Sequence, residues 1–102
     1  ELICGSHGNN QEVSHAFASD LMSDVLTVNC DSLLLITGLA NLQTIRTAEM
    51  SDINTILFVR NKSVTPEMKK LAEELGITLI RCSSTMFRAS GELYRAGIMP
   101  LY

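Results

Sequence analysis

Residues 55–82 constrain the fold more strongly than any other part of this sequence. They begin with TILFVR, an apolar run of β-branched and aromatic residues that is typical of a strand covered on both faces. Thr65 and Pro66 then supply a hydroxyl N-cap and a first-turn proline, and apolar residues recur at helical spacing over 68–75. Gly76 ends this helix before a second apolar run. The pattern therefore predicts a strand, a helix and a second strand, the unit from which parallel sheets are built.

Similar signals on either side extend this unit into an α/β fold. Apolar strands are expected over 33–37, 55–60 and 77–82, and they alternate with helices over 42–51, 66–75 and 85–96. This alternation predicts a layered α/β sandwich with a mostly parallel central sheet, formed as a single domain over residues 1–102. Earlier strands over 2–4 and 13–18 should extend that sheet or form a small flanking sheet. The C-terminal IMPLY (98–102) is expected to be an irregular tail, because its proline cannot continue a helix.

A short helix is expected after the second strand. Ser19 and Asp20 have side chains that cap helices, and apolar residues 21, 22, 25 and 26 are predicted to face the core. Asp20 and Asp24 stand four residues apart, so their carboxylates could share a face and hold Mg²⁺ or perform acid–base chemistry. The simpler interpretation is an N-cap with a favourable first-turn charge.

Composition narrows the classes of partner. A net charge of −3, with eight lysines and arginines scattered along the chain, provides no basic stripe for phosphate backbones, so no nucleic-acid partner is expected. No apolar run approaches the ~20 residues of a membrane span, so no membrane partner is expected either. The three cysteines, Cys4, Cys30 and Cys82, are an odd number at wide spacing. They favour a reducing compartment over a disulfide framework, which predicts a cytoplasmic protein.

The loops that follow the three main strands form the best candidate ligand site. Right-handed crossovers place these loops at one end of a parallel sheet, where helix N-termini present free N–H groups to ligands. Their hydroxyl, amide and guanidinium donors suit a small anion. The candidate ligand-binding residues are Thr37, Gly38, Asn41, Arg60, Asn61, Ser83, Ser84 and Thr85. The competing interpretation is that these residues serve only as turns and helix caps.

Cys82 and Arg88 have the spacing found in cysteine-dependent phosphatases. In such sites loop N–H groups and the arginine hold phosphate while a thiolate attacks phosphorus. The intervening SSTMF lacks a glycine that would let the backbone curl around an anion. We therefore favour the interpretation that Cys82 is a small hydrophobic residue ending a buried strand and Arg88 lies on an exposed helix face.

The sequence lacks the usual motifs of metal sites, nucleotide-binding loops and hydrolase active sites. His7 and His15 have too few further donors nearby to suggest a metal site. The sequence contains no phosphate-binding loop, no dinucleotide fingerprint and no hydrolase nucleophile elbow. No catalytic residue, metal or cofactor is therefore predicted.

Several segments together resemble a known family. These segments are SDLMSDVL, LLLITG, TILFVRN, TPEMKKLAEELGITLI and SSTMFRASGELY, and their order and spacing resemble the DRTGG domain. That domain is similar to the N-terminal domain of bacterial HPr kinase/phosphorylase. The resemblance spans about residues 1–94 and implies a compact α/β regulatory module, often a homodimer. The residues that name the family would fall near 40–41 and 59–61, where this chain has Ala-Asn and Val-Arg-Asn.

The resemblance also bears on activity and partners. In some family members the module accompanies domains that respond to adenine nucleotides, whereas the kinase's phosphate-binding loop lies in a different domain. The expected function is therefore non-catalytic: a metabolic or transcriptional regulatory module that senses a small anionic metabolite or nucleotide at the strand-to-helix loops. The alternative is a protein-interaction or dimerisation module without a small ligand. A cysteine phosphatase using Cys82 and Arg88 is the most remote possibility.

Overall fold

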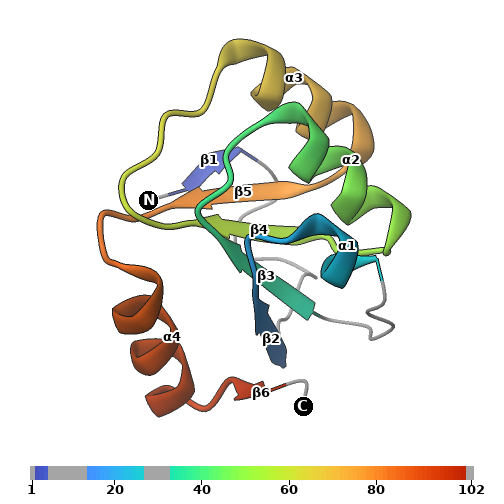
Figure 1. The fold of residues 1–102 in the computed structure, drawn as a ribbon. Coiled ribbons are helices and arrows are strands. Elements are labelled where there is room, and N and C mark those ends of the chain that lie inside the picture. The colour runs from blue at the N-terminus through green and yellow to red at the C-terminus, as the bar shows by residue number, and fades with distance from the viewer. Residues whose placement is uncertain (1, 5–13, 27–32, 101–102) are drawn as a thin grey trace.

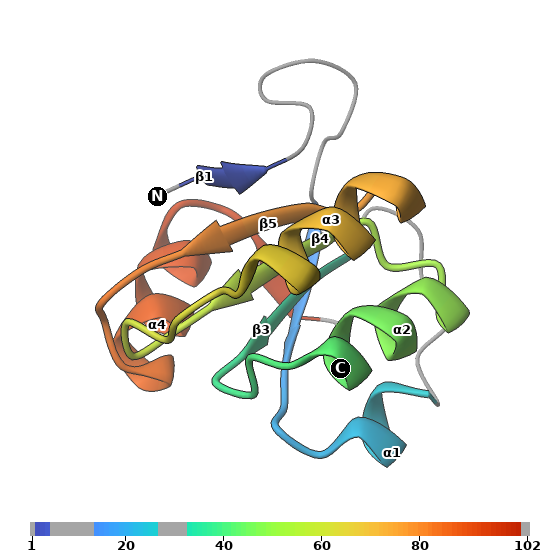
Figure 2. The ribbon, with the colours of Figure 1, turned by 90° about the horizontal axis from the view of Figure 1, so that it is seen from above.

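The computed structural model describes residues 2–4, 14–26 and 33–100, which form a three-layered α/β structure (Figure 1). Helices α1, α2 and α3 lie on one side of the sheet and α4 lies on the other, as the view from above also shows (Figure 2). In chain order the elements are β1 (Leu2–Cys4), β2 (His15–Ala18), α1 (Met22–Val25), β3 (Leu33–Thr37), α2 (Leu42–Met50), β4 (Thr55–Phe58), α3 (Pro66–Leu75), β5 (Thr78–Arg81), α4 (Met86–Arg95) and β6 (Met99–Pro100).

The sheet confirms the predicted fold class. Its strand order is β1-β5-β4-β3-β2-β6; β2 to β6 are mutually parallel and only β1 pairs antiparallel, against β5. The chain steps from β2 to β5 in one direction across the sheet, which places α1, α2 and α3 on one face. It then returns through α4 to β6 at the opposite edge, and a right-handed return of this kind must cross the other face. Both early strands extend the main sheet.

Two sequence predictions about strands need correction. Met99 and Pro100 do not belong to an irregular tail, because they form β6 beside His15 and Ala16 of β2. Proline is tolerated there because β6 is an edge strand and one side of it needs no backbone donor. The strand expected over 55–60 ends at Phe58, since the backbone turns sharply at residue 60.

Strands β3 and β4 lie at the centre of the core. Every residue of both strands is buried, as expected of parallel strands covered on both faces. The larger core cluster lies beneath α1, α2 and α3, and the smaller one lies beneath α4. The larger cluster comprises Met22, Val25, Leu33, Leu35, Ile45, Ala48, Ile53, Ile56, Phe58, Met68, Ala72, Ile77 and Leu79. The smaller comprises Leu34, Ile36, Leu57, Val59 and Ala89, with Met86 and Leu93 packed against it.

Helix boundaries follow the capping residues of the sequence. The Thr65 hydroxyl accepts a hydrogen bond from Met68 N at 3.2 Å, and Gly76 ends α3 in the left-handed conformation at φ 72°. Helix α1 differs from the prediction, because it spans only four residues and cannot turn all four apolar side chains inward. Met22 and Val25 are buried, whereas Leu21 and Leu26 are about half exposed.

The core assignment predicts the effect of shortening Ile45, which is fully buried on the sheet-facing side of α2. Ile45→Ala should lower the free energy of unfolding by about 2–5 kcal/mol, because it removes buried methyl groups and leaves a cavity. Met50→Ala is the matched control on the same helix, since Met50 is 70% exposed. Urea denaturation followed by circular dichroism measures both variants, and equal losses would contradict the assigned helix face.

Candidate functional site

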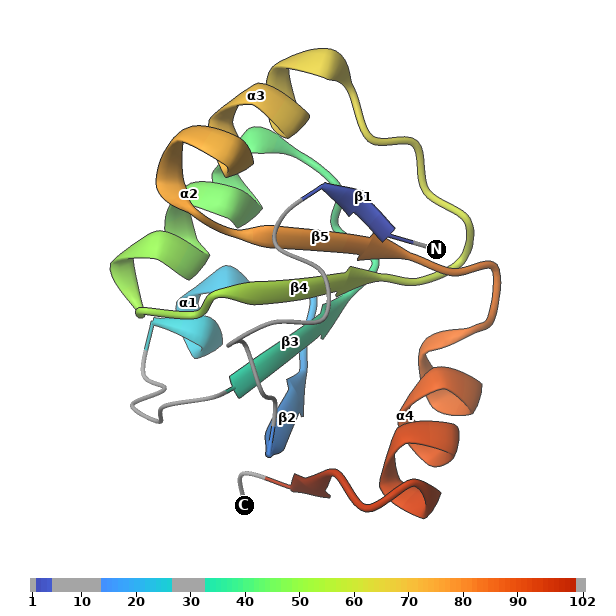
Figure 3. The ribbon, with the colours of Figure 1, turned by 180° about the vertical axis from the view of Figure 1, so that it is seen from behind.

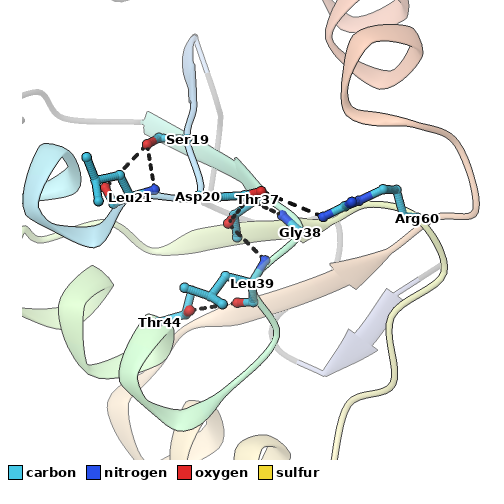
Figure 4. Close-up of polar contacts among 8 residues, drawn as sticks. All are labelled: Ser19, Asp20, Leu21, Thr37, Gly38, Leu39, Thr44 and Arg60. Carbon is cyan, nitrogen blue, oxygen red and sulfur yellow. Dashed lines mark hydrogen bonds and ion pairs between the residues drawn. The ribbon is translucent and has the colours of Figure 1, made fainter.

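Asp20 lies at the centre of the polar contacts at the carboxyl ends of the parallel strands (Figure 4). Its Oδ1 accepts hydrogen bonds from the Gly38 backbone N–H at 2.7 Å and from the Thr37 hydroxyl at 2.9 Å. Its other oxygen, Oδ2, lies 3.6 Å from Nη2 of Arg60. These contacts join the residues that follow β2, β3 and β4 into one site.

The backbone positions each of these groups. Ser19 N donates to the Ile36 carbonyl and Val59 N donates to the Thr37 carbonyl, so strand pairing brings the ends of β2, β3 and β4 together. The Thr37 hydroxyl, which donates to Asp20, also accepts from Leu39 N at 3.1 Å and thereby holds the turn after β3. Gly38, in this turn, lies beside the Arg60 guanidinium (Figure 4).

Gly38 allows this close approach. A Cβ at position 38 would collide with the Arg60 guanidinium, so with a larger residue that flexible group would have to shift from its present position. The observed position of the guanidinium therefore uses the space that glycine leaves.

The loop after β4 has an unusual backbone. Arg60 and Asn61 adopt left-handed conformations, with φ values of 62° and 52°. Their N–H groups donate to the carbonyls of Ser84 and Cys82, both at 2.8 Å, which fastens this loop to the one before α4. These two N–H groups are therefore already bonded within the protein.

The electrostatics of the site favour a negative charge. The pKa of Asp20 is lowered from its ordinary value of 3.8, chiefly by the hydrogen bond from Gly38 N–H. Burial opposes this effect and raises the pKa, while the Thr37 hydroxyl and the positive charges of Arg60 and Lys62 lower it further. The donors and cations outweigh the loss of hydration, so Asp20 is held as a carboxylate.

The predicted ligand-binding residues separate into three groups. Thr37, Gly38 and Arg60 meet around Asp20. Asn61 and Ser83 instead line a separate cavity of about 360 Å³ with Arg81 and Cys82, and the Ser84 carbonyl bonds to Arg60 N.

Asn41 and Thr85 act as helix caps, as the competing interpretation of the loops expected. Asn41 Oδ1 accepts from Thr44 N at 2.9 Å, and the Thr85 hydroxyl accepts from Arg88 N at 3.2 Å. Both side chains are therefore engaged at the starts of α2 and α4.

Cys82 and Arg88 occupy different environments. Cys82 is partly buried against the smaller core cluster, and its N–H donates to the Phe58 carbonyl at 2.9 Å. Arg88 lies on the exposed face of α4, where its Nε donates to Glu92 Oε1 at 2.9 Å. These positions agree with the interpretation that Cys82 ends a buried strand and Arg88 faces solvent.

Other predicted polar groups are only partly placed by the structure. In residues 2–4, 14–26 and 33–100, no three His, Cys, Asp or Glu side chains gather closely enough to hold a metal ion. His7 and Cys30 lie outside the described residues. None of the described helices has the length and apolar character needed to cross a membrane.

Asp20 is the site residue that sequence reasoning assigned to a different role. Its carboxylate bonds to the turn after β3, eighteen positions away in sequence, and does not cap the following helix. Ser19 has the local role instead, since its hydroxyl accepts from Leu21 N at 3.0 Å. One signal in the sequence could have indicated this role. Asp20 closely follows the strand predicted over 13–18, and the carboxyl ends of neighbouring parallel strands lie at one edge of the sheet.

Comparison with known proteins adds no family or fold assignment to this geometry. The sequence matches no family model, and no curated protein or solved structure is significantly similar to it.

The lowered pKa of Asp20 predicts a pH-dependent contribution to stability. A carboxylate with a depressed folded-state pKa stabilises the fold above its unfolded pKa, and that contribution is lost as the pH falls through the folded value. Asp20→Asn should therefore be less stable than the parent at neutral pH. The difference in unfolding free energy should shrink between about pH 5 and pH 2.

Denaturant titrations across this pH range measure the difference. Ser63→Ala is the control, because Ser63 is exposed and has no ionisable side chain, and its difference from the parent should not change over this pH range. A constant gap between the parent and Asp20→Asn would contradict the assigned contacts of Asp20.

The left-handed backbone at Asn61 predicts opposite effects of two small substitutions. Asn61→Gly should equal or exceed the parent in stability, because glycine adopts positive φ without a steric cost. Asn61→Ala should be less stable than Asn61→Gly by about 1–2 kcal/mol, the cost of a left-handed conformation for an L-residue. Thermal unfolding of the two variants tests this order, and a more stable alanine variant would contradict the left-handed assignment.

Proposed function

We propose that this domain is a non-catalytic regulatory module that binds a small anionic metabolite or nucleotide at the carboxyl ends of β2, β3 and β4. The observation that carries the proposal is the Arg60 guanidinium, which lies beside the Thr37–Gly38 turn with 52% of its side chain exposed. A guanidinium presents several N–H donors in a fixed plane, and this geometry suits phosphate and carboxylate groups.

Asp20 supports the proposal because its carboxylate marks a place where the protein stabilises an anion. The Gly38 N–H and the Thr37 hydroxyl both donate to it, and its lowered pKa reports surroundings that favour negative charge. A ligand phosphate that replaced the carboxylate would meet these two donors together with Arg60. The internal carboxylate thus acts as a competitor for the ligand.

The contact between Arg60 and Asp20 is a loose one, so an external anion could replace the carboxylate beside Arg60. Their closest atoms are 3.6 Å apart, which is longer than the ~2.8 Å of a charge-assisted hydrogen bond. An exposed pair of this kind contributes little to stability, so Arg60 loses little when an external anion replaces Asp20. The main cost of the exchange is the loss of the Gly38 and Thr37 hydrogen bonds to the carboxylate, which the ligand must replace with its own.

The regulatory part of the proposal rests on the resemblance of this sequence to the DRTGG domain. The resemblance includes Ser19-Asp20 and Thr37-Gly38, which supply the contacts around Asp20. Proteins of that family are regulatory modules, often attached to other domains, and we propose a regulatory role for this chain as well.

A thermal-shift panel with inorganic phosphate, AMP and glucose 6-phosphate tests the proposal. A true ligand at 100 times its dissociation constant should stabilise the domain by about 2.7 kcal/mol through mass action. Arg60→Gln should abolish the response. Lys69→Gln removes the same charge from the exposed side of α3 and should leave the response intact.

Two further variants test the geometry of the site. Asp20→Asn should bind the responding anion more tightly than the parent, because the competing carboxylate is gone. Gly38→Ala should bind it more weakly, because the added Cβ displaces the Arg60 guanidinium. Gly91→Ala, in open space on α4, is the control for the glycine substitution. A lack of response in both the parent and Asp20→Asn would reject anion binding at this site.

A further inference from the structure

A polar cavity lies next to the loop that carries Arg60. Its volume is about 360 Å³, which is within the range of small-molecule sites in proteins. The residues that line it are Asn61, Arg81, Cys82 and Ser83. The lining thus offers an amide, a guanidinium and a hydroxyl, which are strong hydrogen-bonding groups. Such a lining suits a part of a ligand that carries several hydroxyl groups.

The cavity and the Arg60 site lie at the same edge of the sheet. Asn61 follows Arg60 directly, whereas Cys82 and Ser83 follow β5, the strand next to β4. The segments that leave β4 and β5 lie side by side beyond the strand ends (Figure 3). The two places therefore both belong to the carboxyl edge, where ligands of parallel sheets bind.

The spacing of the strands gives the separation of the two places. The Arg60 side chain extends to the turn at Gly38, which follows β3 (Figure 4). The cavity lies at the end of β5, two strands away from β3 in the sheet order. Neighbouring strands are about 4.8 Å apart, so the guanidinium and the cavity are separated by about 10 Å. A phosphate ester of a sugar is long enough to contact both.

The loop backbone holds the two places in a fixed relation. The N–H groups of Arg60 and Asn61 donate to the carbonyls of Ser84 and Cys82, both at 2.8 Å. The residue that carries the guanidinium is therefore fastened to the loop that lines the cavity. A ligand that contacts both places does not have to order this loop first, and a preorganised site loses less entropy on binding.

We propose that the ligand is a sugar phosphate, with its phosphate at Arg60 and its hydroxyl-bearing body in the cavity. This inference rests on the proposed function, because it assigns the remainder of the ligand whose anionic group binds at Arg60. Asn61 and Ser83 then determine specificity, since their amide and hydroxyl groups meet the sugar and not the phosphate.

The lining of the cavity favours a sugar over a nucleobase. Proteins commonly stack a bound base on an aromatic side chain. None of the described residues that line the cavity is aromatic. A sugar phosphate should therefore bind more tightly than a nucleoside monophosphate of the same charge.

Isothermal titration calorimetry with methyl phosphate, glucose 6-phosphate, ribose 5-phosphate and AMP tests the proposal. Methyl phosphate has the ester group without a sugar, so it reports the contribution of the Arg60 site alone. The tighter of the two sugar phosphates should bind the parent about tenfold more tightly than methyl phosphate, because its hydroxyls form hydrogen bonds in the cavity. AMP should bind more weakly than that sugar phosphate.

Two variants separate the cavity from the anion site. Asn61→Gly removes the amide and keeps the left-handed turn that carries Arg60, because glycine adopts positive φ freely. Ser83→Leu fills the cavity with an apolar side chain at an exposed position. Each should weaken sugar phosphate binding about fivefold and leave methyl phosphate binding unchanged. Ser63→Leu, the same change at another exposed serine, is the control and should bind both compounds like the parent.

The outcomes distinguish this inference from the anion site itself. If methyl phosphate binds and neither sugar phosphate binds more tightly, the cavity assignment is wrong and the proposed function stands. The assignment is also wrong if Ser83→Leu keeps the full preference for the sugar phosphate, or if AMP is the tightest ligand. If none of the four compounds binds to the parent, the proposed function fails and this inference fails with it.

Discussion

The parallel pairing of β3 with β4 is the interaction on which the other elements depend. Both strands are buried along their whole length, and Leu34 to Thr37 pair in register with Thr55 to Phe58. Backbone groups in such a position have no access to water, so the ladder must satisfy them. Alternating side chains of the pair enter both core clusters, so the two strands anchor the three helices on one face and α4 on the other.

The polar site follows from where these strands end. The carboxyl ends of parallel strands lie at the same edge of a sheet, so Asp20, Thr37 and Arg60 meet although they are far apart in sequence. An Asp carboxylate at this edge would ordinarily face water. Here Asp20 stays half exposed, and the Gly38 N–H, the Thr37 hydroxyl and two nearby cations lower its pKa by more than partial burial raises it. The strand ends thus hold the Asp20 carboxylate in surroundings that favour its negative charge, although no glycine-rich loop is present there.

Sequence reasoning succeeded where the physical signal is local and failed where it depends on distant residues. Thr65, Pro66 and Gly76 fix the ends of α3 by contacts within a few residues, and both boundaries were predicted. Strand β6 was missed, because two residues become a strand only when β2 lies alongside.

Two features of the site were missed for the same reason. The role of Asp20 depends on its distance from the turn after β3, and local sequence favours a helix cap at that position. The left-handed turn at Arg60 and Asn61 is sustained by hydrogen bonds to Cys82 and Ser84, so the sequence around position 60 alone does not predict it. The positions of Thr37, Gly38 and Arg60 at the strand ends were predictable, whereas their common partner was not.

The hydrogen bonds from Arg60 and Asn61 to the loop before α4 have a thermodynamic consequence. They tie the backbone that carries the Arg60 guanidinium to the carbonyl of Ser84, which directly precedes the N-cap residue of α4. A displacement of the backbone at Arg60 and a displacement of the start of α4 are therefore linked, because the same two hydrogen bonds oppose both. Any change that stabilises the position of one of these segments also stabilises the position of the other, by an equal free energy.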